Sequence, residues 1–321
     1  MMHMREMMKM SSWSSDKIRK KWNELKGQNG ASKLVETDHV MNFFLRIGEN
    51  GQEEIMLITP DRPGKLHSSQ GFEITVLQRQ DRTWATRISC TEKGNEEIFS
   101  ILCQDLMDAS ENAVNQLDGL QKVEKRFITW QKNFKLLKKT LTDNELIGLV
   151  GELEFALNYL SMHYSWKEIM ESWHGPEFGD RDYVFPNAWY EVKTVSTGKH
   201  SITISSLNQL ESSEPGYLIQ FFSNKTSSTD PEGISVWDLI HKVRTIIADP
   251  VLIEEFDDKL RNIGYVERQE YKDKYFALGE MNVYSVDSKF PRLVPANVPV
   301  QVTSAKYEIS LSAIEPWRTT L

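Results

Sequence analysis

A change of hydrophobic period near residue 95 constrains the fold of this 321-residue chain more than any other feature. Before that point, strand-like apolar runs flank two turn signals, Asn50-Gly51 and Gln80-Asp81-Arg82, which are typical of β-hairpins. After Glu96, apolar side chains recur at helical spacing, at Ile98, Ile101, Leu102, Leu106 and Met107. The pattern predicts an α/β protein in which a small antiparallel sheet over residues 34–92 precedes helices.

Several helix ends can be read from the sequence. Ser15 is expected to cap a first helix that runs to Lys26 and ends at Gly27. Thr142 and Glu145 form a T-x-x-E capping box that starts a later helix. Further helices are predicted over residues 236–247 and 251–263, and the chain from Tyr271 onward looks strand-like.

One predicted helix, over residues 120–139, is strongly basic and has Glu124 as its only acid. Two interpretations of its charge stay open, a solvated helix face and a contact with the phosphates of a nucleic acid. Its apolar stripe is Phe127, Trp130, Phe134 and Leu137, and its basic residues are Lys122, Lys125, Arg126, Lys132, Lys135, Lys138 and Lys139.

Composition restricts the function classes. The net charge of −8 argues against a strong stand-alone nucleic-acid binder, so such contact would be local or shared with a partner. Cys90 and Cys103 form no C-x-x-C, which excludes a cysteine zinc site and predicts free thiols in a reducing cytoplasm. The first ten residues are expected to be a disordered tail, and no apolar run is long enough to span a membrane. ATP hydrolysis is not expected, because no P-loop pattern occurs.

The segment GDRDYVFPNAWYEVKTV, residues 179–195, contains the residues best suited to bind a cation. Side chains alternate along a strand, so Glu191 and Lys193 would share one face. The turn Pro186-Asn187-Ala188 would fold Asp182 across the hairpin from Glu191. We therefore expect both carboxylates to lie within reach of a single cation. The alternative is an exposed strand face with a cross-strand charge pair.

Mg²⁺ suits this set, because it prefers oxygen ligands and is held by one or two carboxylates plus waters and phosphate. Asp182, Glu191 and the Val192 carbonyl are the expected ligands, and Mn²⁺ would substitute for Mg²⁺. Lys193 would orient a water and offset charge on a phosphate first, and act as a base second. Glu152, on the helix that begins at Thr142, could add a carboxylate, with Glu145 as its rival. Gly148 and Gly151 would let that helix approach closely.

A lone E-x-K is not specific, but the ordered set resembles the PD-(D/E)XK nuclease superfamily. More narrowly, it resembles the prokaryotic PD-(D/E)XK motif proteins associated with restriction and phage-defence operons. The matching pieces are LIGLVGELEF, the W-x-G-P of Trp173 to Pro176, RDYVF, YEVKT, ISSLNQL, NIGYVE and KFPRL. The resemblance implies metal ligation by Asp182, Glu191 and Glu152, catalytic support from Lys193, and a contribution from Gln209 on a following helix. Arg181 stands where narrow-family relatives often place His.

The implied fold is a restriction-endonuclease-like core, a mixed central sheet flanked by helices. An N-terminal antiparallel β domain and a C-terminal α+β extension would accompany it. The expected organisation is a tail and helix (1–33), a β-rich domain (34–94), basic connecting helices (95–140), the nuclease core (141–232) and the C-terminal region (233–321).

The implied activity is Mg²⁺-dependent hydrolysis of double-stranded DNA in the cytoplasm. Partners would be ATPase, helicase-like or methyltransferase subunits, or a second copy of the chain in a homodimer. The alternative is a catalytically inactive nuclease-fold subunit that serves DNA binding or assembly, and RNA remains open as a substrate.

Overall fold

The structure is a computed structural model that describes residues 13–35, 40–64, 66–68, 71–92, 94–137, 139–177, 179–211 and 213–321. The tail expected over the first ten residues lies outside this set. The chain divides into two compact units, Met1–Lys139 and Thr140–Leu321. Each contains helices and strands, which confirms a mixed α/β protein. Across the described ranges, no helix is both long enough and apolar enough to cross a membrane.

The first unit is built on a five-stranded antiparallel sheet with the order β1-β2-β3-β5-β4. The two predicted hairpins are present, β2 with β3 and β4 with β5. Gly51 in the first turn has a φ of +81°, a left-handed conformation that glycine adopts without strain. The strands are β1 (Ser32–Leu34), β2 (Asn42–Ile47), β3 (Glu53–Thr59), β4 (Phe72–Gln78) and β5 (Trp84–Cys90).

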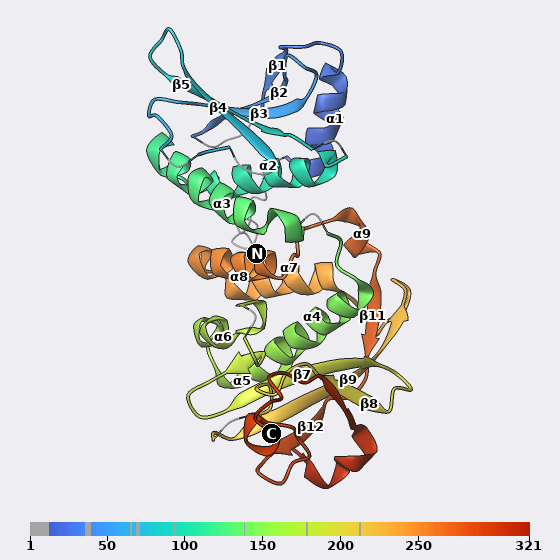
Figure 1. Ribbon diagram of the computed structural model, residues 1–321. Helices are drawn as coiled ribbons and strands as arrows, with labels where there is room; N and C mark the ends of the chain where they lie inside the picture. Colours follow the sequence, from blue (N-terminus) through green and yellow to red (C-terminus); the bar gives the residue numbers. More distant parts are fainter. Residues whose placement is uncertain are drawn as a thin grey trace, which may run out of the picture. The chain divides into compact units, whose positions relative to one another are not determined.

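Helices α1 (Ser15–Leu25), α2 (Glu96–Ser110) and α3 (Gln116–Leu137) accompany this sheet (Figure 1). The cap of α1 is Ser14 rather than the predicted Ser15, since the Ser14 hydroxyl accepts the Lys17 N–H at 3.3 Å. Apolar packing joins the helices to one another and to the sheet. Trp22 of α1 stacks on Phe99 of α2 at 5.3 Å between ring centroids, and Phe72 of β4 meets Phe127 of α3 at 5.3 Å.

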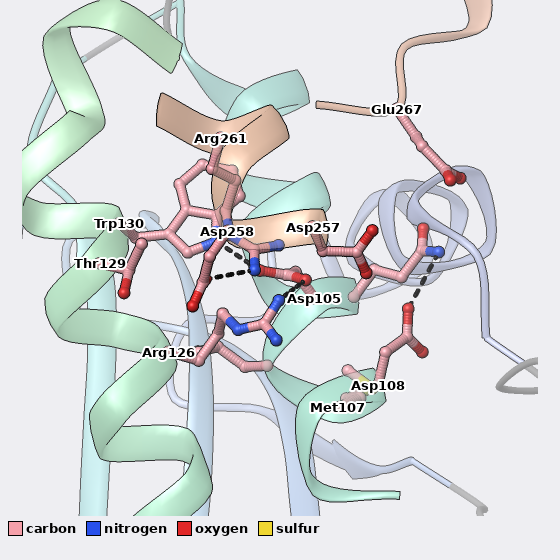
Figure 2. A network of polar contacts seen from close by, with 12 residues as sticks. Asp105, Met107, Asp108, Arg126, Thr129, Trp130, Asp257, Asp258, Arg261 and Glu267 are labelled. Atoms are coloured by element: carbon pink, nitrogen blue, oxygen red, sulfur yellow. Dashed lines mark hydrogen bonds and ion pairs between the residues drawn. The ribbon is translucent and has the colours of Figure 1, made fainter. Parts of the chain in front are cut away.

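The basic residues of α3 do not form one uniform surface. Arg126 is buried and its guanidinium pairs with Asp105 at 2.8 Å (Figure 2). The same carboxylate accepts the Trp130 indole N–H at 2.6 Å. Arg126 is thus engaged within the fold, while Lys138 lies outside the described residues. A contact of α3 with phosphates stays a prediction, and its exposed lysines are Lys125, Lys132, Lys135 and Lys139.

The second unit is organised around β9, which pairs with strands on both of its edges. Strand β7 runs parallel to β9 on one edge, and β11 and β12 run antiparallel on the other. Two more strands, β8 and β13, pair separately. The strands are β6 (Tyr183–Val184), β7 (Trp189–Ser196), β8 (Ser201–Ile204), β9 (Gly216–Thr226), β10 (Gly233–Ser235), β11 (Tyr275–Leu278), β12 (Asn282–Val286), β13 (Tyr307–Ser310) and β14 (Arg318–Thr319).

Different layers cover the two faces of this sheet. Helix α4 packs on β7, and α7 packs on α4, so these helices cover one face (Figure 1). The C-terminal strands and turns pack with Trp189 and Leu218 on the other face. The helices are α4 (Asp143–Phe155), continued as a π-turn (Ala156–Leu160) and α5 (Ser161–His163), then α6 (Trp166–Ser172), α7 (Val236–Ile247), α8 (Pro250–Asn262) and α9 (Gln269–Lys272).

One expectation for this unit is wrong. Gln209 was expected on a helix, but β8 ends at Ile204 and a turn follows. The turn is closed by the Gln209 side chain, whose Oε1 accepts the Ser205 N–H at 2.8 Å. Helix α6 was not predicted, and it begins at a capping box formed by Ser165 and Glu168. A side-chain cap thus starts α6 where the apolar pattern is weak. At Gln209 a side-chain hydrogen bond closes a turn where a helix was expected.

The two glycines of α4 should respond to substitution in opposite directions. A Cβ on Gly148 would meet no atom within 4 Å, whereas a Cβ on Gly151 would lie 1.9 Å from the Thr194 hydroxyl of β7. Gly148→Ala should raise the free energy of unfolding by about 1 kcal/mol, because alanine favours a helix interior. Gly151→Ala should lower it by about 1–3 kcal/mol through overpacking. Urea denaturation of both variants tests the pair, and changes of the same sign would contradict this account.

Candidate active site

Asp182 lies at the outer edge of the sheet, where β6 pairs with β7. The register Tyr183 to Tyr190 and Val184 to Trp189, continued by one step, places Asp182 opposite Glu191. The Asp182 Oδ2 accepts the Val192 N–H at 2.7 Å. Because the N–H and C=O of one residue in a strand point to the same edge, the Val192 carbonyl also points away from β9 and toward Asp182. The turn Pro186-Asn187-Ala188 thus sets this geometry locally.

Glu191 is the most deeply buried acid of the site, at 1% exposed. Its Oε1 accepts from the Lys193 ammonium at 2.6 Å and from the Gln209 amide at 2.6 Å. Its Oε2 is buried and has no hydrogen-bond partner within the described ranges. Burial and the charge of Asp182 raise the pKa of Glu191 to about 8, although Lys193 acts in the opposite direction. An unsatisfied carboxylate oxygen in this position suits a cation more than a packing role.

Lys193 follows Glu191 on the same strand face, as alternation requires, and its side chain is 17% exposed. Burial lowers the pKa of Lys193, but the charges of Glu191 and Asp182 and the bond to Glu191 outweigh it and raise the pKa. Lys193 is therefore an ammonium group near neutral pH. It can donate to a water or to a phosphate oxygen, and it cannot accept a proton in that state.

Glu152 reaches the site from helix α4, on the other face of the sheet. Its Oε2 accepts the indole N–H of Trp173 at 2.7 Å, and its backbone carbonyl accepts from the Tyr183 hydroxyl at 3.1 Å. Burial and the charge of Asp182 raise the pKa of Glu152 well above its ordinary value. Glu145, its rival, is engaged elsewhere, since its carboxylate closes the capping box with Thr142. The helix carboxylate beside Asp182 is therefore Glu152.

The turn that follows α6 lies against Asp182 and Glu152. The Asp182 carbonyl accepts the N–H groups of His174 at 2.8 Å and of Gly175 at 3.3 Å. A Cβ on residue 175 would stand 3.0 Å from Asp182 Oδ1 and 3.1 Å from Glu152 Oε2. The two carboxylate oxygens thus flank one small space that a side chain at 175 would fill. Glycine keeps that space open.

Gln209 joins the site from a turn on the opposite side of the sheet from α4. Its amide Nε2 donates to Glu191 while its Oε1 accepts from Ser205, so both ends of the amide are held. The resemblance implied that Gln209 contributes to the site, and its amide contacts Glu191. It does so from a turn and not from the implied helix. The structure thus brings Asp182, Glu191, Val192, Lys193, Glu152 and Gln209 together at one edge of the sheet.

Whether this set fits a metal can be judged from its donors. Throughout the part of the chain that the structure describes, no group of three or more His, Cys, Asp or Glu side chains could hold a metal ion. Mg²⁺ needs fewer, since one or two carboxylates with a carbonyl and waters suffice. The unpartnered Oε2 of Glu191 and the space beside Gly175 match that requirement. The residues present therefore fit Mg²⁺ better than a metal that demands a closed cage of side chains.

Two residues that the sequence did not assign to the site lie next to it. Trp173 is fully buried, and its indole N–H donates to the Glu152 carboxylate. Gln220 of β9 pairs in register with Lys193 and is buried, with its Nε2 lacking a partner among the described residues. The W-x-G-P motif was a signal for Trp173. Gln220 sits in an apolar strand, and its proximity to Lys193 depends on strand pairing.

Comparison with known proteins adds one finding. A family model described as "Putative PD-(D/E)XK family member, (DUF4420)" matches residues 18–312. No curated protein and no solved structure matches the chain.

Proposed function

Because the chain belongs to this PD-(D/E)XK family, we propose that it is a magnesium-dependent DNA endonuclease subunit that hydrolyses phosphodiester bonds. One observation carries the proposal. The Asp182 and Glu191 carboxylates and the Lys193 ammonium meet at one sheet edge, with a buried Glu191 oxygen that has no partner among the described residues. A cross-strand charge pair on an exposed face, the alternative for this motif, does not account for a glutamate that is 1% exposed.

In this proposal Asp182, Glu191 and the Val192 carbonyl hold Mg²⁺, and the Glu152 carboxylate assists from the helix side, beside Asp182. Bound Mg²⁺, or Mn²⁺ in its place, would polarise the scissile phosphate and lower the pKa of a water. Lys193 orients the attacking water and offsets negative charge that develops on the phosphate oxygens. Gln209 and Lys193 together fix the Glu191 carboxylate, and Trp173 fixes that of Glu152.

The proposal extends to the architecture and the partners. The second unit would be the restriction-endonuclease-like core with its C-terminal extension, and the first unit an N-terminal domain for target or partner contacts. The net charge of −8 favours shared DNA binding, either by ATPase, helicase-like or methyltransferase subunits of a prokaryotic defence system or by a second copy of the chain. Cleavage of both strands of a duplex needs two active sites, which a homodimer would supply.

The second candidate is a catalytically inactive subunit for DNA binding or assembly. Its supporting observation is the Lys193–Glu191 ion pair, which already occupies one Glu191 oxygen at 2.6 Å. Metal binding separates the two candidates, since an inactive subunit has no need to bind one at Asp182.

Metal titration of Asp182→Asn tests the proposed function. The purified chain should release or absorb heat on titration with Mn²⁺ in a calorimeter, and it should nick supercoiled DNA with Mg²⁺ or Mn²⁺. Asp182→Asn should lose both responses, because an amide is a weak ligand for a hard cation. Asp180→Asn is the matched control, since the Asp180 side chain accepts from Ser206 instead and should leave both responses intact. Metal binding by Asp182→Asn equal to wild type would favour the inactive subunit.

A further inference from the structure

Two arginines stand beside the candidate active site on the side of the Gln209 turn. The Arg181 guanidinium lies 4.7 Å from the centre of the Trp189 ring and donates to the Asn208 carbonyl at 3.3 Å. The Arg292 guanidinium donates to the Leu210 carbonyl. Both arginines are therefore held by backbone carbonyls that directly flank Gln209, the residue that contacts Glu191.

Neither arginine is neutralised within the described residues. No carboxylate lies within ion-pair distance of Arg181 or Arg292 in the described ranges. The Asp180 carboxylate accepts from the Ser206 hydroxyl, and Oε1 of Glu191 accepts from Lys193 and Gln209. The Nε of Arg181 is buried without a hydrogen-bond partner there. A guanidinium offers five N–H donors, so Arg181 and Arg292 each have donors that the described hydrogen bonds do not use.

Placing these two cations together has an electrostatic cost. Arg181 is partly buried, and the positive charge of Arg292 acts on it against the negative charges of Asp180, Glu191 and Glu211. Like charges in a partly desolvated place repel more strongly than in water. An anion from outside the chain would remove that repulsion and use the free donors. The planar donor fork of arginine matches phosphate oxygens in particular.

We propose that Arg181 and Arg292 form a binding site for a second backbone phosphodiester of the nucleic-acid substrate, next to the one that is cleaved. This inference rests on the proposed function, because it takes the neighbouring carboxylates as the cleavage site. The Asn208–Leu210 turn couples the two places, since its carbonyls orient the arginines and its central residue orients Glu191. The arginines would hold the strand in register without reading its bases.

Binding measured without cleavage tests the inference. Fluorescence anisotropy would follow a labelled DNA duplex in Ca²⁺ over a range of salt concentrations, with Arg181→Met, Arg292→Met and the matched control Lys289→Met. Methionine keeps an apolar chain on Trp189 and removes the charge together with the N–H donors. Each arginine variant should bind about tenfold more weakly, and its slope of log K against log salt should fall by about one. Lys289→Met, an exposed change on the same segment as Arg292, should keep the wild-type slope.

The outcomes separate this inference from the proposed function. If wild type cleaves DNA and folded Arg181→Met and Arg292→Met keep its affinity, salt slope and KM, the phosphate site is overturned and the nuclease stands. If wild type does not cleave but both arginine variants lose affinity and slope, the nuclease fails and the phosphate site stands. Thermal unfolding checks each fold. If Arg181→Met does not fold, Arg181→Lys takes its place and should keep the slope while Arg292→Met loses it.

Discussion

Lys193→Ala is expected to reduce metal-dependent DNA cleavage by about 10²–10³-fold or more, the loss typical when a positioned charge donor is removed. Among the residues that the structure describes, Lys193 is the one ammonium group in contact with Glu191, and its raised pKa keeps it charged at neutral pH. Without it, no cation from this strand face offsets the charge that develops on the phosphate. The loss should appear in kcat at saturating DNA, because Lys193 is assigned to the reacting groups rather than to substrate binding.

Three comparisons make this result interpretable. Lys199→Ala removes an exposed lysine just beyond β7 and should leave cleavage unchanged. Lys193→Gln keeps a hydrogen-bond donor for Glu191 without the charge and should be nearly as inactive. Calorimetry with Mn²⁺ should still show binding in Lys193→Ala, because its ligands remain. Equal cleavage by wild type and Lys193→Ala would remove Lys193 from the mechanism and leave the E-x-K motif a structural ion pair.

Arg244→Met is expected to lower the free energy of unfolding of the second unit by about 3 kcal/mol. The Arg244 guanidinium of α7 bonds to Asp257 of α8 at 2.8 and 2.9 Å and also pairs with Glu267. Removing the cation would leave two carboxylates without their partner, and a half-broken buried pair costs more than the intact pair contributes. The side chains are 17% and 19% exposed, so we expect the lower end of the usual range.

The matched control removes the whole cluster. Arg244→Met combined with Asp257→Asn and Glu267→Gln should recover much of the lost stability, because no unpaired charge remains. Urea denaturation with constant m-values would measure both proteins. If the free energy of unfolding of Arg244→Met lies within about 0.5 kcal/mol of wild type, the range of ordinary surface changes, the cluster is solvated. Activity should also fall in Arg244→Met, since α8 carries Lys259, whose ammonium donates to the Trp173 carbonyl at 2.8 Å.

Local sequence determined those parts of the protein whose geometry needs only neighbouring residues. Strand alternation puts Glu191 and Lys193 on one face, and the Pro186 turn places Asp182 across from them, because both follow from backbone geometry over a few residues. The start of α4 at the Thr142 cap is local in the same way. Cap chemistry also explains the missed helix α6, since Ser165 and Glu168 repeat the pattern read correctly at Thr142.

Tertiary structure decided everything that joins distant segments at the sheet edge. Gln209 reaches Glu191 from a turn, Trp173 holds Glu152 from 21 residues away, and Arg292 meets the Leu210 carbonyl from 82 residues away. Gly148 and Gly151 read alike in the sequence, yet only Gly151 meets a neighbouring strand. Such contacts depend on which layers pack together, and no local pattern encodes that packing. The sequence determined which groups could bind a cation, and the packing of α4, β7 and the Gln209 turn decided that they meet.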